Sequence, residues 1–193
     1  MLLPNPDDNL LYASIDEAGR GSLVGCVVSA CVIWQPTEYD YLINDSKKIT
    51  PKLRKELSDY IKANAIDYSI TFIDQQKIDE INILNATLES MHRSLDKLNV
   101  NIDHILVDGN KFNKYKDIPH TCIIQGDAKY ISIAAASILA KVARDEYMVK
   151  LANEYPEYGW NTNMGYGTHD HIESLKKLGP TPYHRKTFIK NFV

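Results

Sequence analysis

The sequence predicts an α/β fold, and three features of the chain predict it. Short apolar segments typical of strands alternate with longer segments that carry apolar residues at helical spacing, which is the pattern of a sheet covered by helices. The 193 residues contain no repeat, low-complexity tract or interdomain linker. Three of the expected strands end in acidic residues, and ligands of open α/β sheets gather at strand ends. We therefore expect a single domain over residues 1–193.

In the first half of the chain, three segments have the composition of strands. They span Leu10–Asp16, Leu23–Trp34 and Asp67–Ile73. The second is rich in valine, alanine and cysteine, as expected for a strand that is buried on both faces. The third alternates with the period of a strand.

Two helices are expected to accompany these strands. Thr50 and Pro51 form a helix start, with Thr50 as the N-cap and Pro51 at the first helical position, and this helix should run to about Ala63. A second helix is expected from about residue 84 to residue 98 because five apolar residues recur there at helical spacing. They are Leu84, Leu88, Met91, Leu95 and Leu98.

The second half of the chain repeats the alternation of strands and helices. Short strands are expected at His104–Val107 and Cys122–Ile124, followed by a long helix over Ile131–Leu151. The alanines of that helix form a smooth face that fits against a sheet. A last helix, at about His169–Leu178, ends at Gly179-Pro180, a glycine C-cap followed by a helix breaker. Residues from about 155 to 193 are expected to form a helical C-terminal segment.

Composition narrows the possible classes of protein. The three cysteines form no CxxC pair, which argues for a reducing compartment and against a disulfide framework or zinc site. No signal peptide or apolar stretch of transmembrane length is present, so we expect a cytoplasmic protein without a membrane partner. The net charge of −3 does not indicate a nucleic-acid binder. Basic residues nevertheless gather in three runs near the motifs below, at 47–55, 111–116 and 176–190.

The most informative tract is Asp-Glu-Ala-Gly-Arg-Gly at Asp16–Gly21. Neighbouring side chains of a strand point to opposite faces, so the strand must end or bend here if both acids serve one site. Gly19 and Gly21 allow a bend and a close approach of a ligand to the backbone. Arg20 adds a planar donor that suits phosphate. The alternative is a polar turn with surface acids after a core strand.

Two further acids follow expected strands, at Asp108-Gly109 and Gly126-Asp127. Each alone is common in turns, so their recurrence together with Asp16 and Glu17 carries the argument. Four converging carboxylates would repel one another unless cations neutralised them. Oxygen ligands favour Mg²⁺ or Mn²⁺ over zinc, and two such ions can activate water for phosphoryl transfer. The sequence therefore predicts a two-ion site formed by these four acids.

Ordered motifs along nearly the whole chain, from about residue 14 to residue 188, give it a family resemblance. They are Asp16–Gly21, Asn44–Lys48 (Asn-Asp-Ser-Lys-Lys), Asn82–Thr87 (Asn-Ile-Leu-Asn-Ala-Thr), Val107–Asn110, Gly126-Asp127, Ser132–Asp145, Gly165–Thr168 (Gly-Tyr-Gly-Thr), Gly179-Pro180 and His184-Arg185. In these motifs the chain resembles the type 2 ribonuclease H family, to which the bacterial ribonucleases HII belong.

The resemblance implies a ribonuclease H-like fold with a central mixed sheet flanked by helices. It also implies metal-dependent endonucleolytic hydrolysis of RNA that is paired with DNA or embedded in it, with RNA–DNA hybrid and ribonucleotide-containing duplex DNA as the partners. The family's metal-binding carboxylates map onto the four acids above. Its ribose-sensing motif maps onto Gly19, Arg20 and Gly21, and its junction-reading tyrosine onto Tyr166.

Other basic residues are predicted to contact substrate less specifically. Lys47 matches a family lysine near the substrate phosphates. Lys141 and Arg144 are expected on the long helix, where they face substrate or, alternatively, pair with acids. Arg185 is predicted as a substrate-binding residue that binds backbone or, alternatively, caps the terminal segment.

Some features depart from the family pattern or leave alternatives open. Where the family often has His-Lys before Gly-Tyr, this chain has Asn163 and Met164, which we expect to remove positive charge from the substrate groove. The alternatives are a ribonuclease HIII-like hybrid nuclease, a non-catalytic nucleic-acid-binding module on the same fold, and a junction resolvase. We expect a monomer. The terminal Phe188–Val193 lacks the glutamine-led pattern of a sliding-clamp motif.

Overall fold

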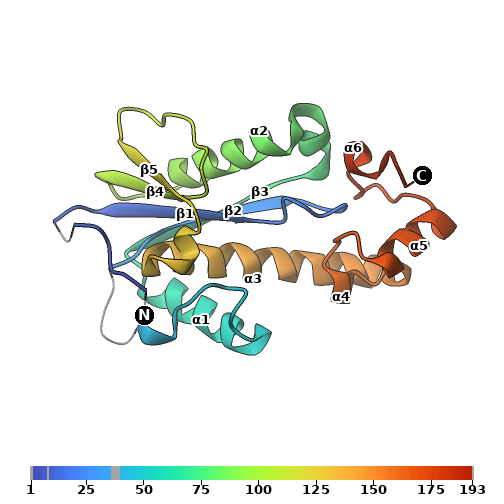
Figure 1. Cartoon of the computed structure of the whole chain (residues 1–193), viewed down its shortest axis with the longest axis horizontal. Coiled ribbons are helices and arrows are strands. Elements are labelled where there is room, and N and C mark those ends of the chain that lie inside the picture. The colour runs from blue at the N-terminus through green and yellow to red at the C-terminus, as the bar shows by residue number, and fades with distance from the viewer. Residues whose placement is uncertain (1, 8, 36–39, 193) are drawn as a thin grey trace.

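The computed structural model describes residues 2–7, 9–35 and 40–192, and within them five strands form one mixed sheet in the order β3-β2-β1-β4-β5 (Figure 1). The strands are β1 (Tyr12–Ala18), β2 (Val27–Ile33), β3 (Asp67–Ile73), β4 (His104–Asp108) and β5 (His120–Ile123). The first three strands pair antiparallel, whereas β4 runs parallel to both β1 and β5. The predicted α/β class and mixed sheet are confirmed.

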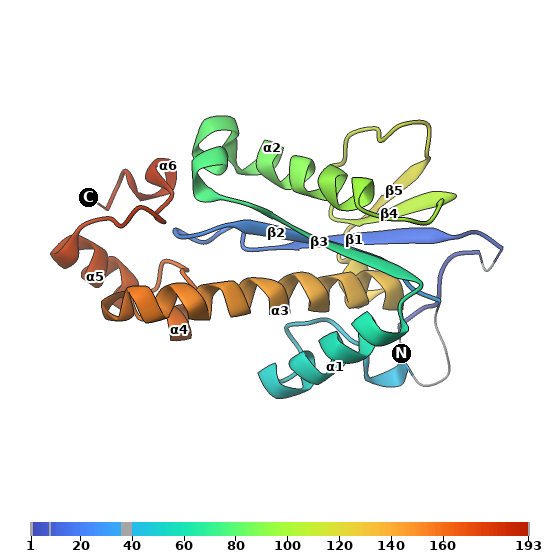
Figure 2. The same ribbon diagram turned by 180° about the vertical axis from the view of Figure 1, so that it is seen from behind.

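Helices cover both faces of this sheet. The described residues form α1 (Pro51–Asn64), α2 (Gln75–Asp96), α3 (Ile131–Glu154), α4 (Trp160–Asn163), α5 (His169–Leu178) and α6 (Lys186–Ile189). As Figures 1 and 2 show, α2 lies on one face and α1 and α3 lie on the other, while α4, α5 and α6 gather beyond one end of the sheet. Three short 3₁₀ turns complete the elements, at Asp40–Leu42, Gly126–Ala128 and Pro156–Tyr158.

The hydrophobic core has one layer on each side of the sheet. The alanine run of α3, Ala134–Ala136, is fully buried with Ala30 and Val32 of β2, as its smooth face predicted. On the opposite face, α2 packs Met91 and Leu95 against the sheet. No helix in the described part of the chain combines the length and hydropathy that crossing a bilayer requires.

Several boundaries differ from the expectation, most clearly in α2. This helix begins at Gln75 rather than near residue 84, because the Asp74 side chain caps it by accepting a hydrogen bond from the Lys77 backbone N–H at 2.8 Å. Asn82 then breaks it with a φ of 67°. The apolar spacing detected from Leu84 onward therefore belongs to the segment after the break.

The ends of β1 and β2 also differ from the expectation. β1 does not end at Asp16 but continues through Glu17 to Ala18, and β2 begins at Val27 instead of Leu23. The connection between the two strands is an irregular loop, and Gly25 lies in it with a φ of +77°.

Strand register brings the predicted acids together. Ile15 of β1 is aligned with Val107 of the parallel strand β4, so the next residues, Asp16 and Asp108, lie at the same level of the sheet. β4 is in turn aligned with β5, with Asp108 opposite Ile123, and the chain then enters the 3₁₀ turn that holds Asp127. The carboxyl ends of three parallel strands thus deliver acids to one edge of the sheet.

Candidate active site

A cleft of about 400 Å³ opens at this edge of the sheet. Most of the predicted site residues line it, together with Ala18, Ser46 and Ser137. They are Asp16, Glu17, Gly19, Arg20, Gly21, Lys47, Asp108, Lys141 and Tyr166. Asp127 adjoins the cleft through Lys47, whose Nζ is 3.6 Å from Asp127 Oδ2. The structure therefore gathers residues from positions 16 to 166 of the chain around one opening.

Asp16 and Glu17 reach the cleft from successive positions of β1. The Asp16 side chain is buried, and its Oδ1 accepts a hydrogen bond from the Glu17 backbone N–H at 2.6 Å. Burial raises the pKa of Asp16 well above its usual value, and the charges of Glu17 and Asp108 raise it further, against a hydrogen bond from Ser137 that lowers it. Burial also raises the pKa of Glu17, although Arg20 opposes this with its NH1 at 3.2 Å from Glu17 Oε1.

Asp108 and Asp127 are joined by the turn that follows β5. The backbone N–H of Gly126 donates to Asp108 Oδ1 at 2.6 Å, which fixes the carboxylate relative to the turn. Burial raises the pKa of Asp108, and the Asp127 charge adds to this effect. The four acids at this edge of the sheet thus form a row in which neighbours interact, from Glu17 through Asp16 and Asp108 to Asp127. Repulsion among their charges makes the cleft attractive to cations.

The donor chemistry of the cleft fits a hard divalent cation. Across residues 2–7, 9–35 and 40–192, no three side chains of histidine, cysteine, aspartate or glutamate are grouped as ligands of one ion. Mg²⁺, however, commonly keeps several waters and takes only one or two carboxylates together with substrate phosphates. The described lining contains carboxylates and hydroxyls but neither histidine nor cysteine, which favours Mg²⁺ or Mn²⁺ over zinc.

Two lysines bring positive charge to the cleft. The Lys47 side chain is 81% exposed, and although partial desolvation lowers its pKa, the charges of Asp127, Asp45 and Asp16 raise it overall. Lys141 lies on α3, where its Nζ donates to Asp145 Oδ1 at 2.6 Å. Both predicted lysines therefore reach the cleft, and Lys141 also pairs with an acid, the alternative that its sequence context left open.

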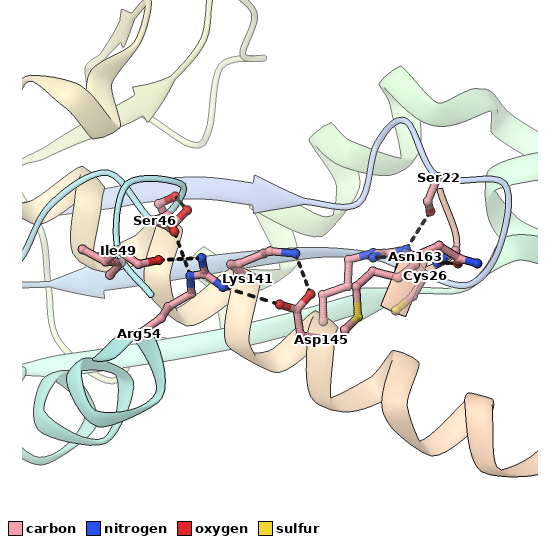
Figure 3. Close-up of polar contacts among 12 residues, drawn as sticks. Ser22, Cys26, Ser46, Ile49, Arg54, Lys141, Asp145 and Asn163 are labelled. Atoms are coloured by element: carbon pink, nitrogen blue, oxygen red, sulfur yellow. Dashed lines mark hydrogen bonds and ion pairs between the residues drawn. The ribbon is translucent and has the colours of Figure 1, made fainter. Parts of the chain in front are cut away.

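A polar network connects the two lysine-bearing segments (Figure 3). Arg54 of α1 donates from Nε to the Ser46 carbonyl at 2.8 Å and from NH2 to the Ile49 carbonyl at 3.1 Å. Its NH1 lies 3.8 Å from Asp145 Oδ2, and the other oxygen of Asp145 holds Lys141. The sequence placed Arg54 in a basic run, and Asp145 and Ser46 in family motifs, but no local pattern indicated a role for any of the three.

Arg144 and Arg185 are fully buried, and both brace the loop between β1 and β2. Arg144 donates to Ser22 Oγ at 2.7 Å and to the carbonyl oxygens of Val24, Cys26 and Met164. Arg185 donates to the carbonyl oxygens of Gly19, Arg20, Gly25 and Cys26 at 2.8 to 3.0 Å. This placement corrects the prediction of direct substrate contact, because neither side chain has exposed surface to offer. Arg185 binds the backbone of this chain instead.

The two glycines of the Gly-Arg-Gly tract have different physical roles. Gly19 has a φ of +93°, and a Cβ there would lie 2.0 Å from Arg144 Nε, so the buried arginine requires glycine at this position. At Gly21 the nearest atom to a built Cβ is Tyr166 Cε1 at 3.9 Å, so the backbone there is open to the cleft. Close approach of a ligand to backbone is therefore expected at Gly21 rather than at Gly19.

Replacing Arg185 with methionine should destabilise the fold. The substitution keeps much of the apolar stem but removes this donor from three buried carbonyl oxygens, those of Gly19, Gly25 and Cys26, and from the part-buried carbonyl of Arg20. The carbonyls of Gly19 and Cys26 keep second donors in Ser22 and Arg144. We expect the free energy of unfolding to fall by about 2–4 kcal/mol, since each unsatisfied buried group costs about 1–3 kcal/mol and relaxation recovers part of it. Urea unfolding measures the loss. Arg93→Met, at a side chain that is 55% exposed, is the matched control and should change stability by less than about 0.5 kcal/mol. Equal losses of stability in the two variants would contradict the stabilising role of Arg185 in the loop between β1 and β2.

The loop before α5 presents Tyr166 to the cleft. Met164 and Gly165 adopt positive φ values of 50° and 76°, and the Asn163 side chain accepts a hydrogen bond from the Gly165 backbone N–H at 2.8 Å. Met164 packs against the hydrophobic cluster of the C-terminal segment that contains Trp160. The expectation that position 164 faces the substrate groove is therefore wrong, because its side chain belongs to this cluster.

Comparisons with known proteins show which family the chain is similar to. The family model described as Ribonuclease HII matches residues 13–191. The ribonuclease HII of Bacteroides thetaiotaomicron is 51% identical over 188 residues, which are 97% of this chain and 94% of that protein. The solved ribonuclease H2 from Pyrococcus horikoshii OT3 has a TM-score of 0.76 at 28% identity and covers 91% of this chain and 92% of its own.

A more distant solved structure shares the fold alone. Bst-RNase HIII in complex with Mn²⁺ has a TM-score of 0.68 at 19% identity and covers 88% of this chain and 61% of its own. Together, these solved structures confirm the expected ribonuclease H-like fold.

Proposed function

The chain belongs to the ribonuclease HII family and is a nuclease of the hydrolase class, and from this we propose that it cuts RNA paired with DNA and cuts on the 5′ side of single ribonucleotides embedded in duplex DNA. The observation that carries the proposal is the convergence of four acids with the Gly-Arg-Gly tract and Tyr166 around one cleft. A hydrolytic site for phosphodiesters needs the acids, and selection for ribose needs groups that contact the sugar beside the scissile phosphate.

The metal proposal is a pair of Mg²⁺ or Mn²⁺ ions held by Asp16, Glu17, Asp108 and Asp127. Such ions lower the pKa of bound water and neutralise charge that develops on the phosphate and the leaving oxygen. The raised carboxyl pKa values of Asp16, Glu17 and Asp108 support this proposal, because bound cations remove the repulsion that raises them. The fold neighbour solved with Mn²⁺ is consistent with an ion of this type.

We assign ribose recognition to the opening between Gly21 and Tyr166. A 2′-hydroxyl is what distinguishes RNA from DNA at one position, and it both donates and accepts hydrogen bonds. The open backbone at Gly21 suits contact with such a group, whereas the half-exposed Tyr166 ring suits packing against the neighbouring deoxyribose. An extra hydroxyl on that neighbouring sugar would crowd the ring, so we expect a long hybrid, in which every sugar of the RNA strand carries this hydroxyl, to be cut more slowly. This arrangement favours a junction between RNA and DNA.

Positive side chains of the cleft are assigned to the phosphate backbone. Lys47 is highly exposed beside Asp127, and Arg20 is half exposed beside Glu17. Lys141 is more enclosed and is oriented by Asp145. Such contacts position a duplex without reading its bases, so we expect cleavage to depend on the sugar and not on the sequence.

The rival functions predict different substrates. Ribonuclease HIII-like activity is disfavoured because the family model and the 51% identical relative are ribonucleases HII. A non-catalytic binding module would bind hybrid without cutting it, and a junction resolvase would cut branched DNA without needing ribose. The presence of three acids in the cleft, with Asp127 beside it, favours catalysis over binding alone.

Rates on four labelled substrates test the proposal. They are duplex DNA with one ribonucleotide, a long RNA–DNA hybrid, all-DNA duplex and a four-way DNA junction, each with Mg²⁺, with Mn²⁺ and with a chelator. We expect metal-dependent cleavage of the first two alone. Cleavage of the four-way junction would indicate a junction resolvase instead. Binding of the hybrid without cleavage in either metal would indicate a non-catalytic binding module.

A further inference from the structure

His171 occupies an unusual position for a residue outside the cleft. It lies in the first turn of α5, fully buried, and its backbone N–H donates to Oγ1 of Thr168, the N-cap of that helix, at 3.3 Å. Its imidazole is directed back toward the loop that presents Tyr166, and Nδ1 lies 2.8 Å from the Tyr166 carbonyl oxygen. On the other side of the ring, Trp160 of α4 donates from Nε1 to Nε2 at 3.0 Å.

These two contacts determine the protonation of the imidazole. A carbonyl oxygen only accepts, so Nδ1 must carry a proton, and an indole N–H only donates, so Nε2 must be unprotonated. The ring is therefore a neutral imidazole that accepts from Trp160 and donates to Tyr166. Burial lowers the pKa of His171, which is consistent with the neutral form.

The ring of Tyr166 takes its position from a backbone that is held at several points. The Tyr166 N–H donates to the Asn163 carbonyl at 2.9 Å, and the Tyr166 carbonyl also accepts from the Thr168 N–H at 2.8 Å. These bonds lie within the loop itself. The bond from His171 differs because it ties the loop to the buried first turn of α5.

We propose that His171 is a positioning residue that holds Tyr166 toward the cleft and thereby sets the preference for single ribonucleotides. The inference rests on the proposed function, in which Tyr166 packs on the deoxyribose beside the ribonucleotide. A displacement of about 1 Å at a positioning group costs about 10²-fold in rate, so loss of one fixed point of the loop should be measurable. The loss of rate should be largest for the duplex with a single ribonucleotide, because that substrate depends most on Tyr166.

Two isosteric variants separate the two hydrogen bonds of the ring. In His171→Asn, the side-chain amide lies at the level of Nδ1 and keeps a donor for the Tyr166 carbonyl. In His171→Gln, the amide lies at the level of Nε2 and keeps an acceptor for the Trp160 N–H. Asparagine is one methylene shorter than glutamine and removes more packing, so a purely structural role predicts at least as large an effect from His171→Asn as from His171→Gln.

The readout is the ratio of kcat/KM on a single-ribonucleotide duplex to kcat/KM on a long RNA–DNA hybrid. We expect His171→Gln to lower this ratio at least about tenfold and His171→Asn to stay within about threefold of the wild-type ratio. Adding Tyr166→Ala to His171→Gln should lower the ratio little further, since both changes act on the same contact. Equal ratios in the two histidine variants would overturn the inference.

The Tyr166→Ala variant shows whether a negative result concerns the role of His171 alone or the proposed function of Tyr166. A lowered ratio in Tyr166→Ala beside an unchanged ratio in His171→Gln overturns the role of His171 alone. An unchanged ratio in Tyr166→Ala overturns junction reading by Tyr166, and the role of His171 with it.

Should a histidine variant not fold, side-chain ¹⁵N NMR of the wild-type protein gives a second measurement. We expect the His171 imidazole to be protonated at Nδ1 and unprotonated at Nε2. The opposite tautomer, or a mixture of the two, would overturn the inference.

Discussion

Replacing Asp108 with asparagine should lower the rate of metal-dependent cleavage of ribonucleotide-containing duplex at least about 10³-fold. The substitution keeps the size of the side chain and an oxygen that can accept from the Gly126 backbone N–H, but it removes one charge from the acid set. About 4 kcal/mol of transition-state stabilisation corresponds to this factor. Single-turnover rates at saturating Mg²⁺ measure the loss.

The same variant should be more stable than the wild type when metal is absent. Burial and the Asp127 charge raise the pKa of Asp108, so ionisation of this group costs stability in the fold. The folded state binds protons more tightly at this site than the unfolded chain, and stability should therefore fall in the wild type as the pH rises above about 4. The variant should show a higher melting temperature in chelator at neutral pH and a smaller upward shift on addition of Mg²⁺.

Asp117→Asn provides the matched control for Asp108→Asn. The Asp117 side chain is fully exposed and pairs with Lys114, away from the cleft. This substitution should change neither the cleavage rate nor the response to metal. Near-normal cleavage by Asp108→Asn would place the catalytic metal elsewhere.

Tyr166→Ala should reduce kcat/KM for a single embedded ribonucleotide by about 10- to 100-fold, and for a long hybrid by only a few fold. The reason is geometric: the ring is 38% exposed and borders the open backbone of Gly21, where the sugar beside the ribonucleotide would lie. In a long hybrid the neighbouring sugar is a ribose and not the deoxyribose on which the ring packs, so cleavage of the hybrid depends less on this ring.

Tyr68→Ala is the appropriate comparison for Tyr166→Ala. Tyr68 has nearly the same exposure, 37%, but lies on strand β3 outside the cleft. We expect it to leave both substrates unaffected. Equal losses of the two substrates in Tyr166→Ala would reduce Tyr166 to a packing residue of the loop.

Helices and strands that are marked by capping residues, helix breakers or regular alternation could be predicted from the sequence. α5 has the predicted bounds because Thr168 caps its start and glycine and proline follow its end. β3 also matches, since its alternation is short and uninterrupted. α2 was predicted too short because the polar residues near Asn82, where the helix breaks, hide the first segment from a periodicity argument.

The acids could be predicted because strand ends converge in this class of fold, whereas the supporting residues could not. Arg185 pairs with carbonyl oxygens about 160 residues away along the chain, and no local pattern indicates such partners. A buried guanidinium and a substrate-binding one look alike in sequence. The role of His171 is hidden for the same reason, because both hydrogen bonds of its ring depend on how α4 and α5 pack.

Product mapping on one substrate tests the central claim most directly. Wild-type protein with Mg²⁺ is incubated with a 5′-labelled duplex that contains a single ribonucleotide, and the position and chemistry of the new ends are determined. Hydrolysis by water predicts a 3′-hydroxyl on the upstream fragment and a 5′-phosphate on the ribonucleotide. The ribose contact proposed at Gly21 predicts one cut, on the 5′ side of the ribonucleotide. A cut on the 3′ side that leaves a 2′,3′-cyclic phosphate would mean attack by the ribose hydroxyl itself, and would contradict the account.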